Sequence, residues 1–346
     1  MRGDSDGVAV GVVGAGAMGT RHADNLHSKV VGVRVAGVTD ANPARAEAVA
    51  AKCGSAKVFE DARSLIEDGG IEAVLIASPD DTHAGLVLEC LRSSKPVLCE
   101  KPLATGSEDA RKIVEAEAQL GKKLVQIGFM RRYDPQHVAV KEVVDAGAIG
   151  RPLLFEGWHR NVALPPFMSV EDVTTEFVTF AAAIHDFDSV RWLLGQEIQE
   201  VYARGVNTDP AFGAVTYDLQ LIQLSLSGGC LATIEVYVTA DYGYEVGLEL
   251  VGERGTARTA SPQSPVVRRD GAQSQAIEQD FPERFQTAYL IEVEQWIEGI
   301  KNGRLIGPDV WDGYTSVLAA EGCVASLRSG MPQRLPSLER PPLAEV

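Results

Sequence analysis

The glycine spacing near residue 14 could hold a phosphate. Gly-Ala-Gly-Ala-Met-Gly follows an apolar run and precedes a helical pattern. In such a turn the glycines allow a tight bend, close approach of a pyrophosphate to the backbone, and close helix–strand packing. Free N–H groups at the N-terminus of the following helix would bind the anion. The pattern predicts a dinucleotide-binding turn made by Gly14, Ala15, Gly16, Ala17, Met18 and Gly19.

An acidic residue lies where the ribose of a dinucleotide would be held. Asp40 ends the next apolar run, 21 residues after Gly19, and a carboxylate there can bind the ribose 2′-hydroxyl. Ala41 and Asn42 offer no guanidinium for a 2′-phosphate, although Arg45 lies nearby. The alternative is a glycine-rich turn with an unrelated surface aspartate. We expect NAD(H) as the cofactor in preference to NADP(H).

Two further residues have side chains suited to moving a proton. Lys101, in Cys-Glu-Lys-Pro, follows an apolar run, and ligands bind beyond the carboxyl ends of the strands in open α/β sheets. His185 lies in the largely apolar segment FAAAIHDFDSVRWLLG. Histidine suits a general base near neutral pH, and an ammonium group stabilises a developing alkoxide. The alternatives are a lysine on an exposed loop and a histidine satisfied in a core.

The first part of the chain must form the sheet that positions the glycine turn and Lys101. Short apolar runs rich in β-branched residues alternate with helical patterns, which indicates βαβ units and a parallel sheet buried on both faces. The predicted strands are 8–13, 33–40, 73–78, 95–100 and 123–129. The predicted helices are 17–26, 43–52, 83–93 and 107–120.

After about residue 130 the pattern changes to one helix, 135–146, a strand, 152–158, and the segment around His185. Residues 198–259 read mostly as strand, with a hairpin turn at Gly228-Gly229. Helical patterns at 288–303 and 312–330 follow. We therefore expect an α/β protein with a doubly wound N-terminal Rossmann domain, 1–130. The C-terminal α+β domain, 131–346, has a mainly antiparallel open sheet, and its last helix can pack back on the first domain.

Composition narrows the classes of partner and compartment. The chain has 346 residues, 45% of them hydrophobic, and a net charge of −16, which argues against binding to nucleic acid or to anionic lipid. The five cysteines are scattered without a CxxC pair, which indicates a reducing compartment. A poor signal-peptide pattern and the lack of a long apolar run predict a cytoplasmic protein without a membrane span. No group with metal-ligand spacing is found, so we expect no metal.

Several motifs together resemble the glucose–fructose oxidoreductase/inositol dehydrogenase/MocA family. The motifs are GAGAMG, SPDDTH, CEKP and VQIGFMRRYDP. The segments GFMRRYDP, GWHRN, HDFDSVRWLL, YGYEVGLELVGERGTA and WDGY are most similar to the inositol 2-dehydrogenases of that family. The resemblance runs from about Val8 to Gly330. It implies NAD(P)-linked oxidation of a polyol or sugar hydroxyl, and a homo-oligomer, commonly a tetramer, assembled through the open sheet.

The resemblance also implies roles for single residues. Lys101 and His185 match the catalytic lysine and histidine of the family. Residues expected to line the polyol pocket are Arg131, His159, Asn161, Asp188 and Tyr244. Ser78, His83, Glu100 and Lys101 are expected on the cofactor side.

One position departs from the family pattern. Inositol dehydrogenases usually carry an aspartate four residues before the catalytic histidine, and this chain has Ala181 there. Asp188 could take part of that role, whereas Asp186 lies about 100° round a helix from His185. The departure leaves three functions open: an inositol 2-dehydrogenase, a sugar or amino-sugar dehydrogenase of the family, or an NAD-binding regulator without activity.

Overall fold

The computed structural model describes residues 7–164, 169, 172–213, 215–260 and 264–343. The chain forms two compact units that are interleaved in sequence. The first unit contains residues 1–133, 287–317 and 339–346, and the second contains residues 134–286 and 318–338. Each unit is described separately below.

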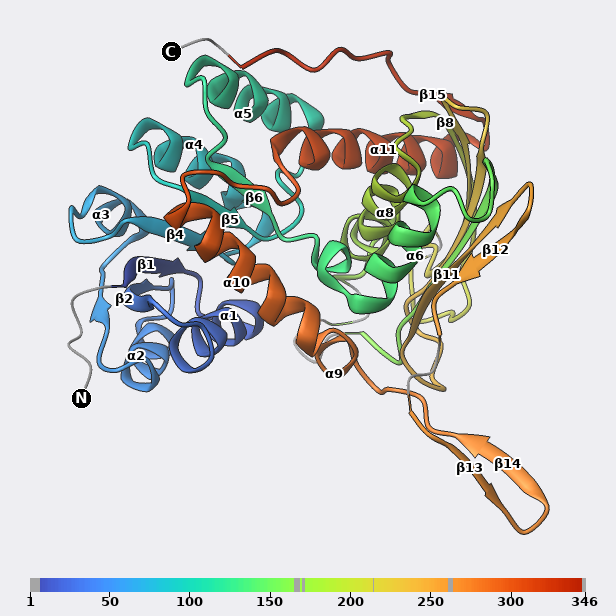
Figure 1. Ribbon diagram of the computed structural model, residues 1–346, viewed down its shortest axis with the longest axis horizontal. Coiled ribbons are helices and arrows are strands. Elements are labelled where there is room, and N and C mark those ends of the chain that lie inside the picture. Colours follow the sequence, from blue (N-terminus) through green and yellow to red (C-terminus); the bar gives the residue numbers. More distant parts are fainter. Residues whose placement is uncertain (1–6, 165–168, 170–171, 214, 261–263, 344–346) are drawn as a thin grey trace. The chain divides into compact units, whose positions relative to one another are not determined.

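The first unit is built on a six-stranded sheet with the order β3-β2-β1-β4-β5-β6, and every pairing in it is parallel (Figure 1). The strands are β1 (Val8–Val13), β2 (Val33–Thr39), β3 (Lys57–Val58), β4 (Ala73–Ile76), β5 (Val97–Cys99) and β6 (Val125–Ile127). The order reverses beside β1, so the carboxyl ends of β1 and β4 form the switch point where ligands bind in such sheets. The predicted parallel Rossmann sheet is confirmed.

Helices cover both faces of this sheet because its strands are apolar on both sides. On one face, Val10 and Val12 share a buried core with Leu26 of α1, Val49 of α2 and Trp296 of α10. On the other, a Cβ on Gly11 would lie 2.4 Å from Cδ2 of Leu65 in α3. The helices are α1 (Ala17–Ser28), α2 (Pro43–Lys52), α3 (Ala62–Glu67), α4 (His83–Arg92), α5 (Ser107–Gln119) and α10 (Gln286–Lys301).

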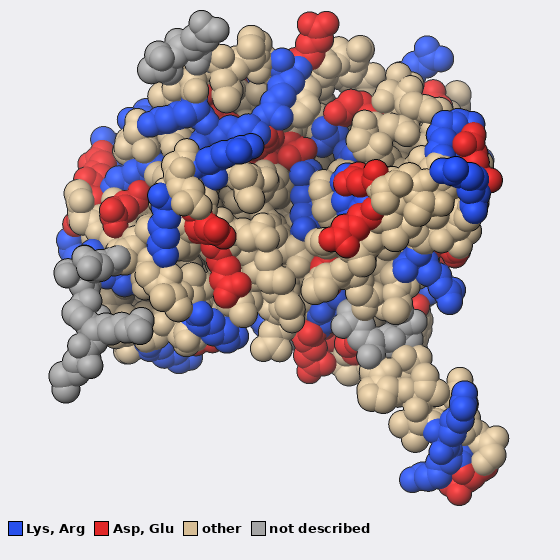
Figure 2. Space-filling view, viewed as in Figure 1, with Lys and Arg blue, Asp and Glu red and all other residues tan. Residues whose placement is uncertain are grey.

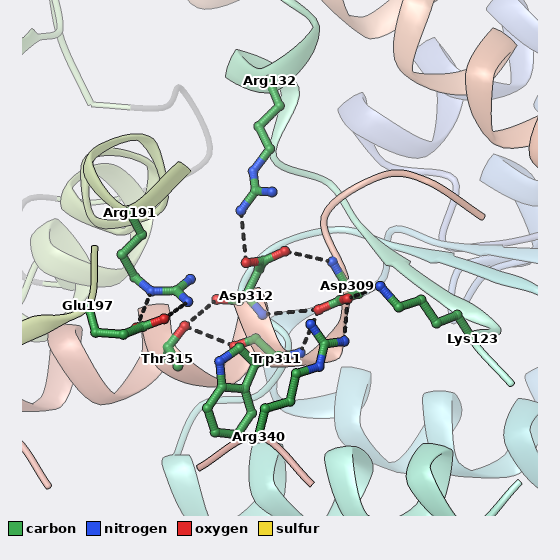
Figure 3. Close-up of polar contacts among 9 residues, drawn as sticks. All are labelled: Lys123, Arg132, Arg191, Glu197, Asp309, Trp311, Asp312, Thr315 and Arg340. Carbon is green, nitrogen blue, oxygen red and sulfur yellow. Dashed lines mark hydrogen bonds and ion pairs between the residues drawn. The ribbon is translucent and has the colours of Figure 1, made fainter. Parts of the chain in front are cut away.

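Charged side chains tie two later segments to the first unit. Asp309 accepts hydrogen bonds from Lys123, at 2.6 Å, and from Arg340, at 2.5 Å (Figure 3). Arg132 pairs with Asp312 at 3.0 Å. Because Asp309 is almost fully buried, its charge requires such partners. These contacts fix the turn that begins α11 (Val310–Ser329), which starts in the first unit and ends in the second.

The second unit is built on a seven-stranded mixed sheet with the order β12-β11-β7-β10-β9-β8-β15. Its pairings are antiparallel except that of β7 with β10, which is parallel. The strands are β7 (Pro152–Arg160), β8 (Ile198–Val206), β9 (Leu219–Leu226), β10 (Leu231–Tyr237), β11 (Glu245–Gly252), β12 (Gly255–Arg258) and β15 (Gln333–Arg334). The mainly antiparallel sheet predicted for this part of the chain is confirmed.

One face of this sheet packs on helices, and alternate residues of each strand point into that core. Phe155, Ile222 and Ile234 from three strands contact a cluster that includes Phe187 of α8 and Cys323 of α11. The helices are α6 (Pro135–Asp145), α7 (Thr175–Val178), α8 (Ile184–Leu194) and α9 (Phe281–Arg284). Arg191 of α8 pairs with Glu197 at 2.8 Å (Figure 3).

A separate hairpin, β13 (Val266–Arg269) and β14 (Ala272–Gln275), projects from the second unit (Figure 1). Its end carries both acidic and basic side chains (Figure 2). Among the described residues, none of the helices is long and apolar enough to cross a bilayer. Across the same residues, no three His, Cys, Asp or Glu side chains gather as a metal ion would require.

Candidate active site

The glycine turn joins β1 to α1 and has the shape of a pyrophosphate cradle. Gly14 has a φ of 94°, and a Cβ on it would lie 2.4 Å from the carbonyl oxygen of Ala77. A Cβ on Gly19 would lie 1.8 Å from the carbonyl oxygen of Gly14. A Cβ on Gly16 would meet nothing within 4 Å. The turn is therefore packed on two sides and open at Gly16, where a ligand can approach the backbone.

The N-terminus of the helix that follows supplies the partial positive charge expected of an anion site. The first turn of α1, which includes Ala17 and Met18, has no acidic side chain. Its N-cap residue, Gly16, has no side chain that could cap the first N–H groups. The N-terminal N–H groups of such a helix favour a bound anion. These residues fit the pyrophosphate of a dinucleotide.

Asp40 is held rigidly at the end of β2. Its Oδ2 accepts a hydrogen bond from the N–H of Ala15 at 2.6 Å, and its Oδ1 accepts one from the N–H of Asn42 at 2.8 Å. Each carboxylate oxygen can accept a further hydrogen bond. The carboxylate thus fixes the glycine turn and is placed to bind a ribose hydroxyl as well.

The two other predicted cofactor-side segments are joined by a buried histidine. In His83, Nδ1 lies 2.7 Å from the carbonyl oxygen of Pro102, and Nε2 lies 2.9 Å from that of Ser78. The Ser78 hydroxyl also lies 2.6 Å from that of Thr82. His83 therefore fixes the turn after β4 to the turn that carries Lys101, and both turns lie at the carboxyl edge of the sheet.

Glu100, which precedes Lys101, is ionised although it is enclosed. Burial would raise its pKa, but the hydrogen bond and charge of His22, with the charges of Lys101 and His83, outweigh burial and lower the pKa. Nε2 of His22 lies 2.8 Å from Oε1 of Glu100. The N–H of Lys101 donates to Oε2 of Glu100 at 3.3 Å. Glu100 thus holds the backbone of Lys101 through this hydrogen bond.

Glu292 of α10 is a second carboxyl group in this unit that no motif indicated. It is fully buried, and neither of its oxygens has a hydrogen-bond partner among the described residues. Burial first, and the negative charge of Glu100 second, raise the pKa of Glu292 well above its usual value. Burial thus favours the protonated form of Glu292, whereas the partners of Glu100 favour its ionised form.

In the second unit, three of the predicted polar residues meet as a buried group of rings. His159 of β7 lies with its ring centroid 6.4 Å from that of His185 in α8 and 6.1 Å from that of Tyr244. Their exposed fractions are 4%, 7% and 4%. Phe285 packs against Tyr244 in a T-shaped arrangement, with ring centroids 6.4 Å apart. The group offers imidazole and phenol donors and acceptors in a largely water-excluded place.

An aspartate that sequence reasoning ranked low joins this group. Oδ2 of Asp186 lies 3.7 Å from Nδ1 of His159, and Asp186 is only 1% exposed. Helical geometry alone had set this residue apart from His185. His159, on the neighbouring strand, lies 27 residues before Asp186 in the sequence, so no local pattern could reveal the contact.

The remaining predicted substrate residues divide between the units. Asn161 follows β7, and its backbone is fixed by hydrogen bonds at 2.8 Å with Tyr237 and with Ala240. Its side-chain Oδ1 is a buried acceptor with no partner among the described residues. Asp188 is buried in α8, whereas Arg131 is buried in the first unit, in the turn after β6.

The backbone before His185 departs from the α-helix assumed from sequence. Residues 179–183 form a π-helical turn, and α8 begins at Ile184. A π-helical turn changes which side chains share a face, and such turns are frequent at functional sites. Ala181 lies within it, so its four-residue spacing from His185 is not that of a regular α-helix.

Comparison with known proteins gives one consistent result. Residues 8–129 match the oxidoreductase family with the NAD-binding Rossmann fold, and residues 141–335 match the C-terminal alpha/beta domain of the same family. Inositol 2-dehydrogenase of Rubrobacter xylanophilus is 55% identical over 344 residues, which are 99% of this chain and 97% of that protein. Inositol 2-dehydrogenase 1 of Saccharopolyspora erythraea is 42% identical over 97% of this chain and 98% of its own length.

Solved structures agree with the sequence comparison. The myo-inositol dehydrogenase of Lactobacillus casei, in complex with NAD(H) and myo-inositol, has a TM-score of 0.90 and 34% identity, covering 96% of this chain and 98% of that one. The scyllo-inositol dehydrogenase of the same organism, with NAD(H) and scyllo-inositol, has a TM-score of 0.88 and 27% identity, covering 95% and 99%. The chain is therefore an oxidoreductase that acts on CH–OH groups and carries an NAD-binding Rossmann domain, and it belongs to the glucose–fructose oxidoreductase/inositol dehydrogenase/MocA family.

Proposed function

We propose that this protein is an NAD-dependent inositol 2-dehydrogenase that oxidises a ring hydroxyl of myo-inositol. The observation that carries the proposal is the buried group of His159, His185 and Tyr244, together with the buried acceptor Oδ1 of Asn161, two residues after His159 in the chain. A site with several hydrogen-bonding groups favours a ligand with many hydroxyls, since unpaired buried polar groups are penalised. The relatives named above support the same substrate class.

The Rossmann unit would hold the cofactor through features already described. Gly14, Gly16 and the start of α1 fit its pyrophosphate, and Asp40 fits a ribose diol. A fixed carboxylate at Asp40 would repel a 2′-phosphate, which favours NAD over NADP. Bound NAD⁺ supplies a hydride acceptor.

The protein then has two tasks, to remove a proton and to stabilise charge. His185 would accept the proton of the reacting hydroxyl, and Lys101 would stabilise the alkoxide that develops on the oxygen. With that hydride acceptor bound, loss of a hydride from the carbinol carbon and of the hydroxyl proton would leave a ketone, NADH and a protonated imidazole on His185. The imidazole returns its proton to water before the next turnover. Arg131, Asp188, Tyr244 and Asn161 would orient the other hydroxyls.

The first test is NADH formation by purified protein with NAD⁺ or NADP⁺ and a panel of inositols and hexoses. Turnover of myo-inositol with NAD⁺ is the expected result. Preference for a hexose or an amino sugar would replace the substrate but retain the reaction. Tight NAD(H) binding without turnover of any compound, in the parent and in Ala181→Asp alike, would contradict the proposal and favour a regulator.

Variants of the two proposed catalytic groups then test the roles. His185→Ala and Lys101→Met should each lower kcat by about 10²–10⁴-fold, while NADH still binds, as followed by fluorescence. His27→Ala is the matched control, because His27 is an exposed histidine on α1. Near-normal turnover in His185→Ala would refute its assignment as the base.

We also propose a homo-oligomer, on weaker support. The outward face of the seven-stranded sheet exposes Leu153, Leu221 and Leu231, and exposed apolar surface on a sheet favours association. Light scattering coupled to gel filtration would give the subunit number. A monomer at micromolar concentration would contradict this proposal. Location in the cytoplasm stays a prediction.

A further inference from the structure

The starting observation is a buried carboxyl group, that of Asp186, which follows the proposed base His185 in the sequence. Asp186 is 1% exposed, and taking a carboxylate out of water is unfavourable unless a partner compensates. Nδ1 of His159 lies 3.7 Å from Oδ2 of Asp186. The ring of His159 in turn lies 6.4 Å from that of His185, tilted by 50°. The carboxylate of Asp186, the imidazole of His159 and the imidazole of His185 thus lie in series in the second unit.

The carboxylate of Asp186 lies against the buried face of β7. Phe155, Gly157 and His159 alternate along β7 on its buried face. A Cβ on Gly157 would lie 3.5 Å from Oδ1 of Asp186 and 2.7 Å from the ring of Phe155. The glycine therefore accommodates the ring of Phe155, and the carboxylate of Asp186 lies at van der Waals distance from the strand. Asp186 is thus next to His159 and buried.

A carboxylate beside Nδ1 determines the chemical form of an imidazole. It favours the tautomer with the proton on Nδ1, which leaves Nε2 as an acceptor. An acceptor of this kind can take a hydrogen bond from a protonated neighbour. The nearby negative charge also stabilises that neighbour's positive charge.

We propose that Asp186 is a positioning residue that acts through His159, holding it in the Nδ1–H tautomer so that it supports His185 when that residue becomes protonated. This inference rests on the proposed function, because it concerns the same proton transfer. The proton passes from the substrate hydroxyl to His185 and leaves to water, and Asp186 and His159 are unchanged at the end. Asp186 of α8, in contact with His159 of β7, would thus supply the carboxylate that Ala181 lacks.

A spectroscopic experiment tests the contact without any need for turnover. The protein has six histidines, so nitrogen-15 labelling of histidine gives a small set of ring signals, which His159→Gln and His185→Gln assign. In the parent protein, His159 should show the pattern of the neutral Nδ1–H tautomer. Asp186→Asn, which keeps the shape and removes the charge, should change the His159 pattern. An unchanged His159 pattern would overturn the proposal.

Kinetics test the consequence for the reaction. Asp186→Asn should lower kcat by about 10–100-fold, as loss of supporting partners commonly does, with little change in KM for the polyol. Asp186→Glu, which keeps a carboxylate, should retain more of kcat than Asp186→Asn. Asp218→Asn is the matched control, because Asp218 is a fully buried aspartate bound to Thr208 and Thr239 on another part of the unit.

The outcomes separate the two proposals. Parental kcat in Asp186→Asn, or equal kcat in the Asn and Glu variants, overturns the role of Asp186. An equal loss of kcat in Asp186→Asn and Asp218→Asn also overturns it, since the effect is then general. If the parent oxidises no polyol, the proposed function fails, and the histidine spectra still decide whether Asp186 sets the tautomer of His159.

Discussion

Replacing Glu292 should make the protein more stable at neutral pH, although the residue lies in the core. Glu292 has no hydrogen-bond partner among the described residues, and burial together with the charge of Glu100 raises its pKa well above the usual 4.5. The folded state therefore keeps a proton that the unfolded state releases. This contribution to stability is fully present below the unfolded pKa and is lost as pH rises toward the folded pKa.

The size of the effect follows from linkage. Between the two pKa values, unfolding releases one proton, so the free energy of unfolding falls by about 1.4 kcal/mol for each pH unit. In Glu292→Gln this slope is absent because the amide does not titrate. From about pH 5.5 upward the variant should gain about 1.4 kcal/mol on the parent for each pH unit until the folded pKa is reached, or roughly 3–6 °C in Tm per pH unit for a unit of this size.

The assay is thermal unfolding of the parent and Glu292→Gln across that pH range. Glu298→Gln is the control, because Glu298 is an exposed glutamate on the same helix, and its Tm should follow the parent at every pH. Parallel curves for the parent and Glu292→Gln would show that Glu292 ionises normally, which would refute the reasoning. A stabilised variant with weaker NAD binding would indicate that the buried acid is retained for the cofactor edge.

Two further predictions follow from fixed charges. Asp40→Ala should weaken NAD⁺ binding at least about tenfold, since charge-assisted hydrogen bonds contribute about 1.5–3 kcal/mol each. The variant should also raise the ratio of NADP⁺ turnover to NAD⁺ turnover. An unchanged ratio would contradict a role of Asp40 in cofactor selection. Arg284→Leu removes the two bonds, 2.8 and 3.0 Å long, that Arg284 donates to the buried Asp134, and should lower the free energy of unfolding by about 3–5 kcal/mol. Burial would raise the pKa of Asp134, but the hydrogen bonds from His137 and Arg284 hold it below its ordinary 3.8. The loss in Arg284→Leu should therefore be full above about pH 4 and shrink in more acid solution. Urea unfolding measures it, and Arg63→Leu, which breaks an exposed pair with Glu67, should cost less than about 1 kcal/mol.

Much of the fold could be predicted because its signals are local. The apolar run 8–13 became β1 with the same bounds, and the helical pattern 288–303 became α10 at Gln286–Lys301. Short or exposed elements left no such signal. Both residues of β3 are exposed, as is nearly all of the hairpin β13–β14, so neither has an apolar pattern.

The candidate site was less accessible to sequence reasoning because its contacts are not local. Motifs indicated His159, His185 and Tyr244 one by one, but only the pairing of β7 with β10 and β11 brings strand residues beside α8. Helical periodicity placed Asp186 away from His185, and it contains no information on what the neighbouring strand presents. Glu292 lies in an ordinary amphipathic pattern, where a glutamate reads as solvent-facing.

The interleaving of the two units has a consequence for synthesis on the ribosome. Trp296 and Val293 complete the core that also contains Val10 and Val12, yet residues 134–286 of the other unit are made in between. The nascent Rossmann sheet therefore stays without one of its covering helices while more than 150 residues emerge. During that interval part of an apolar sheet face is uncovered. We therefore expect ribosome-bound intermediates to be more prone to aggregation, and more dependent on chaperones, than the finished protein.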